Sequence, residues 1–262
     1  MATDLSAYRA NEREQERVAD LFKLVPTGGH RALDVGARDG YLSLRLADRF
    51  DSVVALDLEK PEIDDPRIQS VKGSAAELNF PDQDFDVVLC AEVLEHIPPD
   101  LLPVVCSELA RVAKKTVVIG VPYKQDLRHG QTTCQSCGRS NPPWGHVNSF
   151  DERRLADLFP SLVLENVHFV GTTTAGTNVI SAALLDFAGN PYGTWEQEEP
   201  CIHCGASIGS PPARTLPQRL ATKLGVILND LQGKFATPRG NWIHARFVRA
   251  SGSNENLKMS AE

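Results

Sequence analysis

Short apolar runs alternate with segments of helical periodicity over the first 121 residues. Strand-like runs occupy residues 31–35, 52–57, 68–72, 85–90 and 116–121. Apolar positions recur at helical spacing in residues 6–25, 41–50 and 99–113. Strands that alternate with helices in this way predict a parallel, doubly wound α/β sheet with helices on both faces.

The pattern changes after residue 121. Residues 122–149 and 188–235 are predicted to be insertions. Residues 122–149 form a long loop without periodicity, residues 188–212 are rich in turn-forming residues, and each of these two segments carries a cysteine pair. Residues 177–187 are apolar all round and too short to assign. Within the second insertion a helical stripe is formed by Leu216, Leu220, Leu224, Ile227 and Leu231. We expect the two insertions to form a metal site and a lid over a ligand.

Two later segments complete the expected sheet. A capping box at Ser149–Glu152 predicts a helix that ends near Phe159, and residues 162–170 suit a sixth strand. The last strand is expected within residues 236–249. The prediction is therefore a single domain over residues 1–262 with a Rossmann-like sheet of about seven strands.

The expected domain is divided into successive parts. They are an N-terminal helix in residues 1–29, a cofactor-binding core in 30–121, the two insertions, the last strand and a disordered tail in 250–262.

The charge of the chain limits its partners. A formal net charge of −7 without a basic run argues against nucleic acid, because phosphate binding needs clustered Lys and Arg. The polar N-terminus lacks the apolar core of a signal peptide, and no apolar stretch approaches the roughly 20 residues that span a bilayer. We therefore expect a cytoplasmic protein with no membrane partner. The sequence does not indicate an oligomeric state.

A glycine-containing loop follows the first predicted strand. The segment Asp34-Val-Gly36-Ala-Arg38-Asp-Gly40 precedes a helix, where glycines let the backbone approach a ligand and the helix N-terminus offers free amides. It lacks the G-x-G-x-x-G spacing of dinucleotide enzymes. Asp34, placed before the first glycine, suits a ligand that carries an amine. Asp57 ends the second strand, where a carboxylate can bind both hydroxyls of a ribose.

Three segments carry a resemblance to a known family. Residues 33–40 look like the glycine motif of class I S-adenosylmethionine-dependent methyltransferases. Residues 73–88 and Val93-Leu-Glu-His96 resemble the subgroup similar to ubiquinone/menaquinone-biosynthesis methyltransferases. The match covers residues 30–121 well, and the capped helix and the last strand loosely. It departs from the family at Arg38, which replaces the middle glycine of D-x-G-x-G-x-G.

The resemblance implies a methyl-donor site. It places Gly36, Ala37 and Gly40 at the methionine part, Asp57 and Leu58 at ribose and adenine, Ser74 and Ala75 at the adenine edge, and Cys90 and Glu92 beside the sulfonium. Asp34 joins this site as the expected partner of the donor amine. The alternative is that the two aspartates are only turn residues. The three segments and Asp57 make four motifs, and their occurrence in the expected order argues against this alternative.

Two cysteine pairs indicate a structural zinc site. Cys134 and Cys137 form one CxxCG knuckle, and Cys201 and Cys204 form another. Four thiolates bind one tetrahedral zinc, and a glycine after the second cysteine permits the tight turn. Disulfides and a redox CxxC are the alternatives. The first is weakened by the absence of an export signal, and the second because two pairs are present and neither begins a helix.

Three histidines are candidates for a general base, which a hydroxyl acceptor requires. His146 is the preferred one, because it lies on the loop after the fifth strand, just before a capped helix. His96 and His129 are the others, and a loop histidine that only bonds backbone is the structural alternative. An ordinary imidazole takes up its proton near pH 6.5. Trp144 and Tyr123 are candidate walls of the acceptor pocket.

The predicted function is an O-methyltransferase with S-adenosylmethionine and structural zinc, acting on a small molecule such as a sugar or specialised metabolite. A protein methyltransferase is one alternative. A non-catalytic, zinc-stabilised binding module with a methyltransferase fold is the other.

Overall fold

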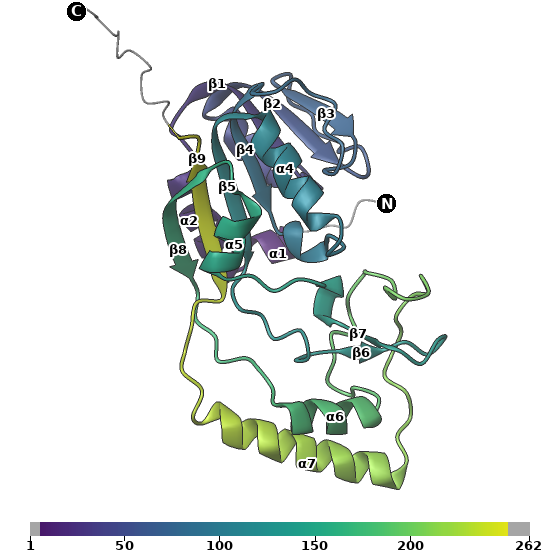
Figure 1. Ribbon diagram of the computed structural model, residues 1–262. Coiled ribbons are helices and arrows are strands. Elements are labelled where there is room, and N and C mark those ends of the chain that lie inside the picture. The colour runs from purple at the N-terminus through teal and green to yellow at the C-terminus, as the bar shows by residue number, and fades with distance from the viewer. Residues whose placement is uncertain (1–5, 251–262) are drawn as a thin grey trace, which may run out of the picture.

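The computed structural model describes residues 6–250 and contains a seven-stranded sheet (Figure 1). Along the chain the strands are β1 (Gly29–Val35), β2 (Phe50–Asp57), β3 (Ile68–Lys72), β4 (Phe85–Ala91), β5 (Ala113–Pro122), β8 (Val163–Val170) and β9 (Trp242–Val248). Their order in the sheet is β3-β2-β1-β4-β5-β9-β8. The first five pair in parallel, and β9 is antiparallel to both β5 and β8. The predicted Rossmann-like sheet of about seven strands is confirmed.

The register of the parallel strands brings their carboxyl ends together. Val35 of β1 pairs with Leu56 of β2 on one side and with Cys90 of β4 on the other, and Ala91 pairs with Gly120 of β5. The loops that follow β1, β2, β4 and β5 therefore emerge at one edge of the sheet. In open α/β sheets this edge is where ligands bind.

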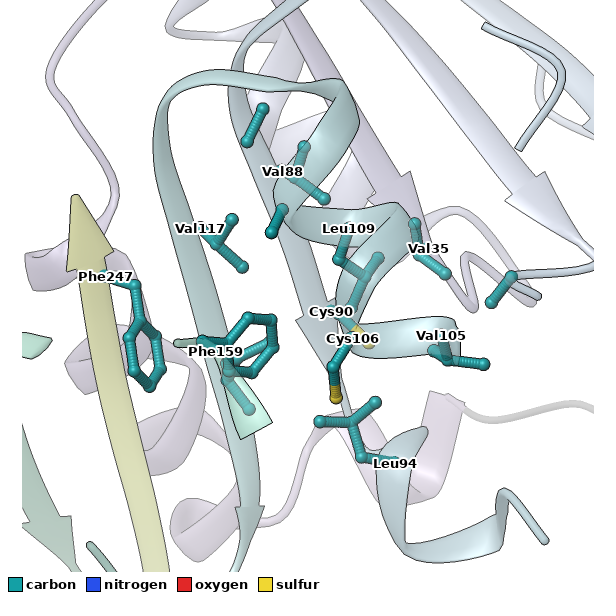
Figure 2. Close-up of a cluster of buried hydrophobic side chains, with 14 of the residues drawn as sticks. Val35, Val88, Cys90, Leu94, Val105, Cys106, Leu109, Val117, Phe159 and Phe247 are labelled. Atoms are coloured by element: carbon teal, nitrogen blue, oxygen red, sulfur yellow. The ribbon is translucent and has the colours of Figure 1, made fainter. Parts of the chain in front are cut away.

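Helices cover both faces of the sheet. On one face lie α2 (Glu12–Leu24) and α3 (Tyr41–Ala47), whose apolar side chains pack on inward positions of β1, β2 and β4. On the other face lie α4 (Leu102–Val112) and α5 (Glu152–Leu158). Figure 2 shows part of this second core, where Val105, Cys106 and Leu109 of α4 pack near Cys90, and Phe159 faces Phe247. Both cysteines are fully buried core residues.

Two helix starts differ from the prediction. The helix expected over residues 6–25 is divided into α1 (Ser6–Arg9) and α2, because the Asn11 side chain accepts a hydrogen bond from the amide of Arg13 and caps a new helix. The capping box at Ser149 is also wrong. Asp151 is the N-cap of α5, and its carboxylate accepts from the amide of Arg154 at 2.8 Å.

The insertions form a separate layer beyond the carboxyl edge of the sheet. This layer contains a two-stranded ribbon of β6 (Thr132–Thr133) and β7 (Ser140–Asn141), then α7 (Leu216–Gly233). It also contains α6 (Val179–Phe187), which precedes the predicted start of the second insertion at residue 188. In Figure 1 α6 lies between α7 and the rest of the molecule. The unassigned segment 177–187 is thus mostly helix α6, and the stripe of leucines lies on helix α7. Residues 251–262 of the expected tail lie outside the described residues.

Two short 3₁₀ helices, η1 (Leu94–His96) and η2 (Pro143–Gly145), lie between these elements. Over residues 6–250, no helix combines the length and the apolar character needed to cross a membrane.

Buried His244 makes stability depend on pH. Its side chain is fully buried on β9 with Nδ1 2.9 Å from Oδ2 of Asp20, and burial lowers its pKa to about 4 despite this carboxylate. The unfolded chain takes up the proton near the ordinary value of 6.5. Between pH 6.5 and pH 4 the unfolded state therefore binds more protons, so stability falls as the pH falls.

Between pH 6.5 and pH 4, we predict that the free energy of unfolding falls by on the order of 2–3 kcal/mol less in His244→Gln than in wild type, because glutamine does not titrate. Chemical denaturation at a series of pH values measures it. His30→Gln is the matched control, because the His30 side chain is exposed. An unchanged pH slope in His244→Gln contradicts the assignment.

Candidate active site

A cavity of about 840 Å³ lies between the carboxyl edge of the sheet and the insertions. Its volume is in the range of small-molecule sites. The glycine loop contributes Gly36, Ala37 and Arg38, and the last strand contributes Trp242. Its lining includes many titratable side chains, among them Arg17, Glu92, Glu95, His96, His129 and His146.

The glycine loop has a left-handed turn that requires glycine at its first position. Gly36 has φ +80°, and a Cβ there would lie 2.2 Å from Cγ2 of Val93. Arg38 also has a positive φ of 46°, so the residue that replaces the family's glycine is held in a conformation that glycine adopts more easily. Its amide donates to Oδ2 of Asp57 at 2.9 Å, and this bond joins the loop to the end of β2.

The predicted donor residues lie along one path over the carboxyl edge. Gly36, Ala37 and Glu92 line the cavity. Further along, Asp57 ends β2 and Leu58 is 69% exposed. The remaining predicted residues are placed differently: Gly40 is the N-cap of α3, the Ser74 hydroxyl accepts from the amide of Ala76, Ala75 is buried, and Cys90 is fully buried in the core.

Asp34 lies beneath the glycine loop. It is 1% exposed, is not among the cavity-lining residues, and accepts a hydrogen bond from the Ser43 hydroxyl at 2.6 Å. Burial raises its pKa to about 7. This carboxyl group therefore supports the loop from below, and its interaction with a donor amine remains a prediction.

A charged network from the N-terminal helix closes one side of the cavity. Arg17 of α2 is bonded to Glu14 at 2.8 Å and lies 3.5 Å from Glu92, which also accepts from Nε1 of Trp242 at 3.2 Å. Sequence reasoning missed Glu14, Arg17 and Trp242. Glu14 and Arg17 precede Val18 and Leu21 at helical spacing, so charges on the apolar face of this helix were the available signal.

His146 and His96 face each other in the cavity wall. Their ring centroids are 4.7 Å apart in an edge-on arrangement, and Nδ1 of His146 donates to Oε1 of Gln125 at 2.6 Å. Nε2 is then the nitrogen with a free lone pair. Burial, with a smaller effect of His96, lowers the pKa of His146 to about 3, so its imidazole is neutral at physiological pH. Gln125 was not identified from the sequence.

Glu95 is a buried carboxyl group beside this pair. Both of its carboxyl oxygens lack a hydrogen-bond partner among the described residues, while its backbone oxygen accepts from the amide of Val147 at 2.7 Å. Burial raises its pKa well above the ordinary value. Potential ligand atoms of Glu95, His96 and His146 lie within 4.8 Å of one another, so the group has the chemistry to hold a proton or a divalent cation.

The other candidate side chains are distributed around the cavity. His129 and Trp144 line it, and the Trp144 amide donates to Oε1 of Gln197 at 2.9 Å. Tyr123 also lines it, and its hydroxyl donates to Oε1 of Glu152 at 3.0 Å. The aromatic residues proposed as walls therefore contribute to the same cavity as the histidines.

The two cysteine pairs meet in a second cluster. The four Sγ atoms lie within 4.8 Å of one another, with Cys134 and Cys204 3.7 Å apart and Cys137 and Cys201 also 3.7 Å apart. No disulfide links them. A tetrahedral site with Zn–S bonds of about 2.3 Å has S–S edges of about 3.8 Å. The arrangement is therefore compatible with one zinc ion.

The two knuckles have the same backbone hydrogen bonding. The amide of Gly138 donates to the carbonyl of Cys134 at 2.8 Å, and Gly205 donates to Cys201 at 2.8 Å. Both glycines have φ near +70°, and no atom lies within 4 Å of the position that a Cβ would take. Glycine is therefore favoured here by the left-handed backbone conformation and not by steric crowding.

Known proteins resemble the core of the chain. A family model described as a methyltransferase domain matches residues 33–119. The ubiquinone biosynthesis O-methyltransferase of Xylella fastidiosa (strain 9a5c) is 35% identical over 109 residues. This alignment covers 36% of the chain and 43% of that protein, so the chain matches less than half the length of this relative.

Solved structures share the fold at low sequence identity. The N-methyltransferase NodS from Bradyrhizobium japonicum WM9, in complex with S-adenosyl-L-homocysteine, has a TM-score of 0.53 at 14% identity, with 95% of this chain and 94% of NodS covered. The [4+2]-cyclase SpnF also has a TM-score of 0.53 at 15% identity, with coverages of 93% and 86%. These similarities concern the fold alone.

We predict close to one equivalent of zinc per chain in purified protein, measured by elemental analysis. Cys134→Ser should lose this metal together with thermal stability, because metal binding free energy contributes to folding. Cys106→Ala is the matched control, since this buried cysteine lies in the α4 core and should leave the zinc content unchanged. Intermolecular or intramolecular disulfides without metal, found by non-reducing mass spectrometry, would refute the site.

Proposed function

We propose that the protein is a class I S-adenosylmethionine-dependent methyltransferase and, more specifically, an O-methyltransferase for a small hydroxylated molecule. The methyltransferase domain model that matches residues 33–119 supports this proposal. The observation that carries the proposal is the neutral His146 imidazole in the wall of a cavity that also reaches the glycine loop. A sugar or a specialised metabolite fits the cavity volume. The O-methyltransferase relative supports an oxygen acceptor.

Residues at the carboxyl edge of the sheet fit the donor. The turn at Gly36 leaves no room for a Cβ, as expected where backbone approaches a ligand. One oxygen of Asp57 is bonded to the Arg38 amide, and its other oxygen remains for ribose hydroxyls. When bound, S-adenosylmethionine supplies a methyl group already activated by a sulfonium. The residues of the chain then have to orient the acceptor and remove its proton.

His146 would accept this proton at Nε2. Gln125 fixes the tautomer by accepting from Nδ1, as partners of catalytic histidines do. Burial makes His146 a weak base in the resting site, so the imidazolium needs stabilisation. Glu95 lies within 4.8 Å, and only its ionised form, which burial disfavours, would stabilise the charged imidazole.

The insertions would enclose the acceptor. Arg38 of the glycine loop and Glu198 of the second insertion form an ion pair of 3.0 Å, so donor loop and lid are in direct contact. Structural zinc held by Cys134, Cys137, Cys201 and Cys204 would keep the lid in place. A cytoplasmic location belongs to the same proposal, because metal-binding thiolates need a reducing compartment.

Asp57→Ala should weaken S-adenosylmethionine binding by about tenfold or more, because charge-assisted hydrogen bonds to two hydroxyls are lost. Isothermal titration calorimetry measures the affinity. Asp51→Ala is the matched control, because Asp51 lies exposed at the opposite end of the same strand. Equal affinities for wild type and Asp57→Ala would remove Asp57 from the donor site.

His146→Ala should lower kcat by about a hundredfold or more while donor affinity stays nearly unchanged. Since the pKa of His146 is near 3, its protonation should cause no loss of rate between pH 8 and pH 5, in contrast to an ordinary histidine. The assay starts with a screen of sugars and phenols.

His203→Ala is the control for this variant, because His203 bonds the Ser140 carbonyl outside the cavity lining. A His146→Ala variant that retains most of its turnover would leave positioning alone to explain catalysis. If a chelator lowered turnover without removing the zinc, the group formed by Glu95, His96 and His146 would instead be assigned as a binding site for a second cation.

A further inference from the structure

Helix α7 exposes a continuous apolar stripe. Each of its members is more than half exposed: Leu216, Leu220, Leu224, Ile227, Leu231 and, directly after the helix, Phe235. Figure 1 shows α7 as the outermost element of its layer, with α6 on its inner side. An exposed apolar surface of this extent is typical of an interaction site.

The stripe lies opposite the surface that α6 covers. The buried residues of α7 are Ala221, Thr222 and Gly225, and a Cβ on Gly225 would lie 3.3 Å from the carbonyl oxygen of Ser181 in α6. At about 100° per residue, Leu224 and Ile227 project from the other side of the helix. Within the described residues, α6 therefore leaves the stripe uncovered.

The spacing of the stripe is symmetric. Successive members are separated by four, four, three, four and four residues, so the pattern reads the same in both directions. An antiparallel copy of α7 would place Leu224 against Ile227 of the partner subunit. The central spacing alternates between three and four residues, as in helices that pack in coiled coils. This symmetry matches a two-fold axis, in which the same surface of each copy is used.

The charged residues beside the stripe are also arranged so that an antiparallel copy would bring opposite charges together. Arg219, Lys223 and Asp230 lie along one flank of the stripe, and no hydrogen bond or ion pair involves their side chains in the part of the chain that the structure describes. In the antiparallel arrangement, Asp230 of the partner subunit lies between Arg219 and Lys223. The two-fold axis repeats this contact at the other end.

We propose that α7 is the dimerisation surface of this protein and that its occupant is a second copy of α7 in antiparallel orientation. An anionic lipid surface would use Arg219 and Lys223 but would be repelled by Asp230. It would also give no reason for the symmetric spacing. The second copy accounts for the apolar stripe, its symmetry and the charges on its flank.

Sedimentation velocity of the full-length zinc-loaded protein tests the proposal. Wild type should sediment with twice the 28.6 kDa mass of the chain. Leu224→Glu and Ile227→Glu should each be monomeric with unchanged circular dichroism, because both side chains are exposed in the single chain. Val104→Glu on α4 is the matched control for an exposed apolar residue and should remain dimeric. A wild-type monomer at micromolar concentration overturns the proposal.

Charge reversal tests the orientation. Asp230→Arg makes the flank entirely basic, and the double variant Arg219→Asp with Lys223→Glu makes it entirely acidic. Each should self-associate about tenfold more weakly or worse, because like charges face each other. An equimolar mixture should regain association as a heterodimer.

Failure of the mixture to regain association overturns the antiparallel arrangement. A protein that stays monomeric but co-sediments with phosphatidylglycerol vesicles through Leu224 and Ile227 overturns the dimer in favour of a lipid surface.

Discussion

The parallel pairing of β1 with β2 and β4 constrains where the glycine loop, Asp57 and Glu92 lie. Val35 pairs with both Leu56 and Cys90, so the three strands end at the same level. The chain leaves β1 through a left-handed turn at Gly36. A side chain at this position would collide with Val93 from the loop after β4. The Arg38 amide then meets Asp57 at the end of β2. Without this register, the glycine loop, the Asp57 carboxylate and Glu92 would not lie on one surface.

The insertions depend on this edge for their position and on the cysteine cluster for their cohesion. Cys134 and Cys137 belong to the loop after β5, whereas Cys201 and Cys204 lie beyond α6, with 63 residues between the pairs. Neither loop has a large apolar core of its own. Four thiols within 4.8 Å join them at one point, and the Arg38–Glu198 ion pair brings the second insertion to the glycine loop. The shape of the cavity is thereby connected with the geometry of the cysteine cluster.

The sequence indicated the sheet because buried parallel strands are read as uninterrupted apolar runs, such as Phe85–Ala91. It also indicated the cysteine cluster, since two CxxCG knuckles are a strong local signal. What it could not show depends on tertiary contacts. Gln125 is 21 residues from His146 and becomes its partner only when the loop folds back. Local capping by Asn11 and Asp151 overrode the predicted helix starts, because each offers a carbonyl or carboxylate oxygen to a free amide.

The position of β9 has a consequence for biosynthesis. This strand is the last in the described chain, yet it lies between β5 and β8 in the sheet. While the protein emerges from the ribosome, the β1–β5 core can pair strand by strand, but β8 has no neighbour until residues 242–248 have been made. Everything between Pro122 and Trp242, including both cysteine knuckles, must therefore be accommodated as one long loop before the sheet closes. Such late, non-local closure is intrinsically slow, so newly made chains pass through a period in which the edge of β5 is exposed.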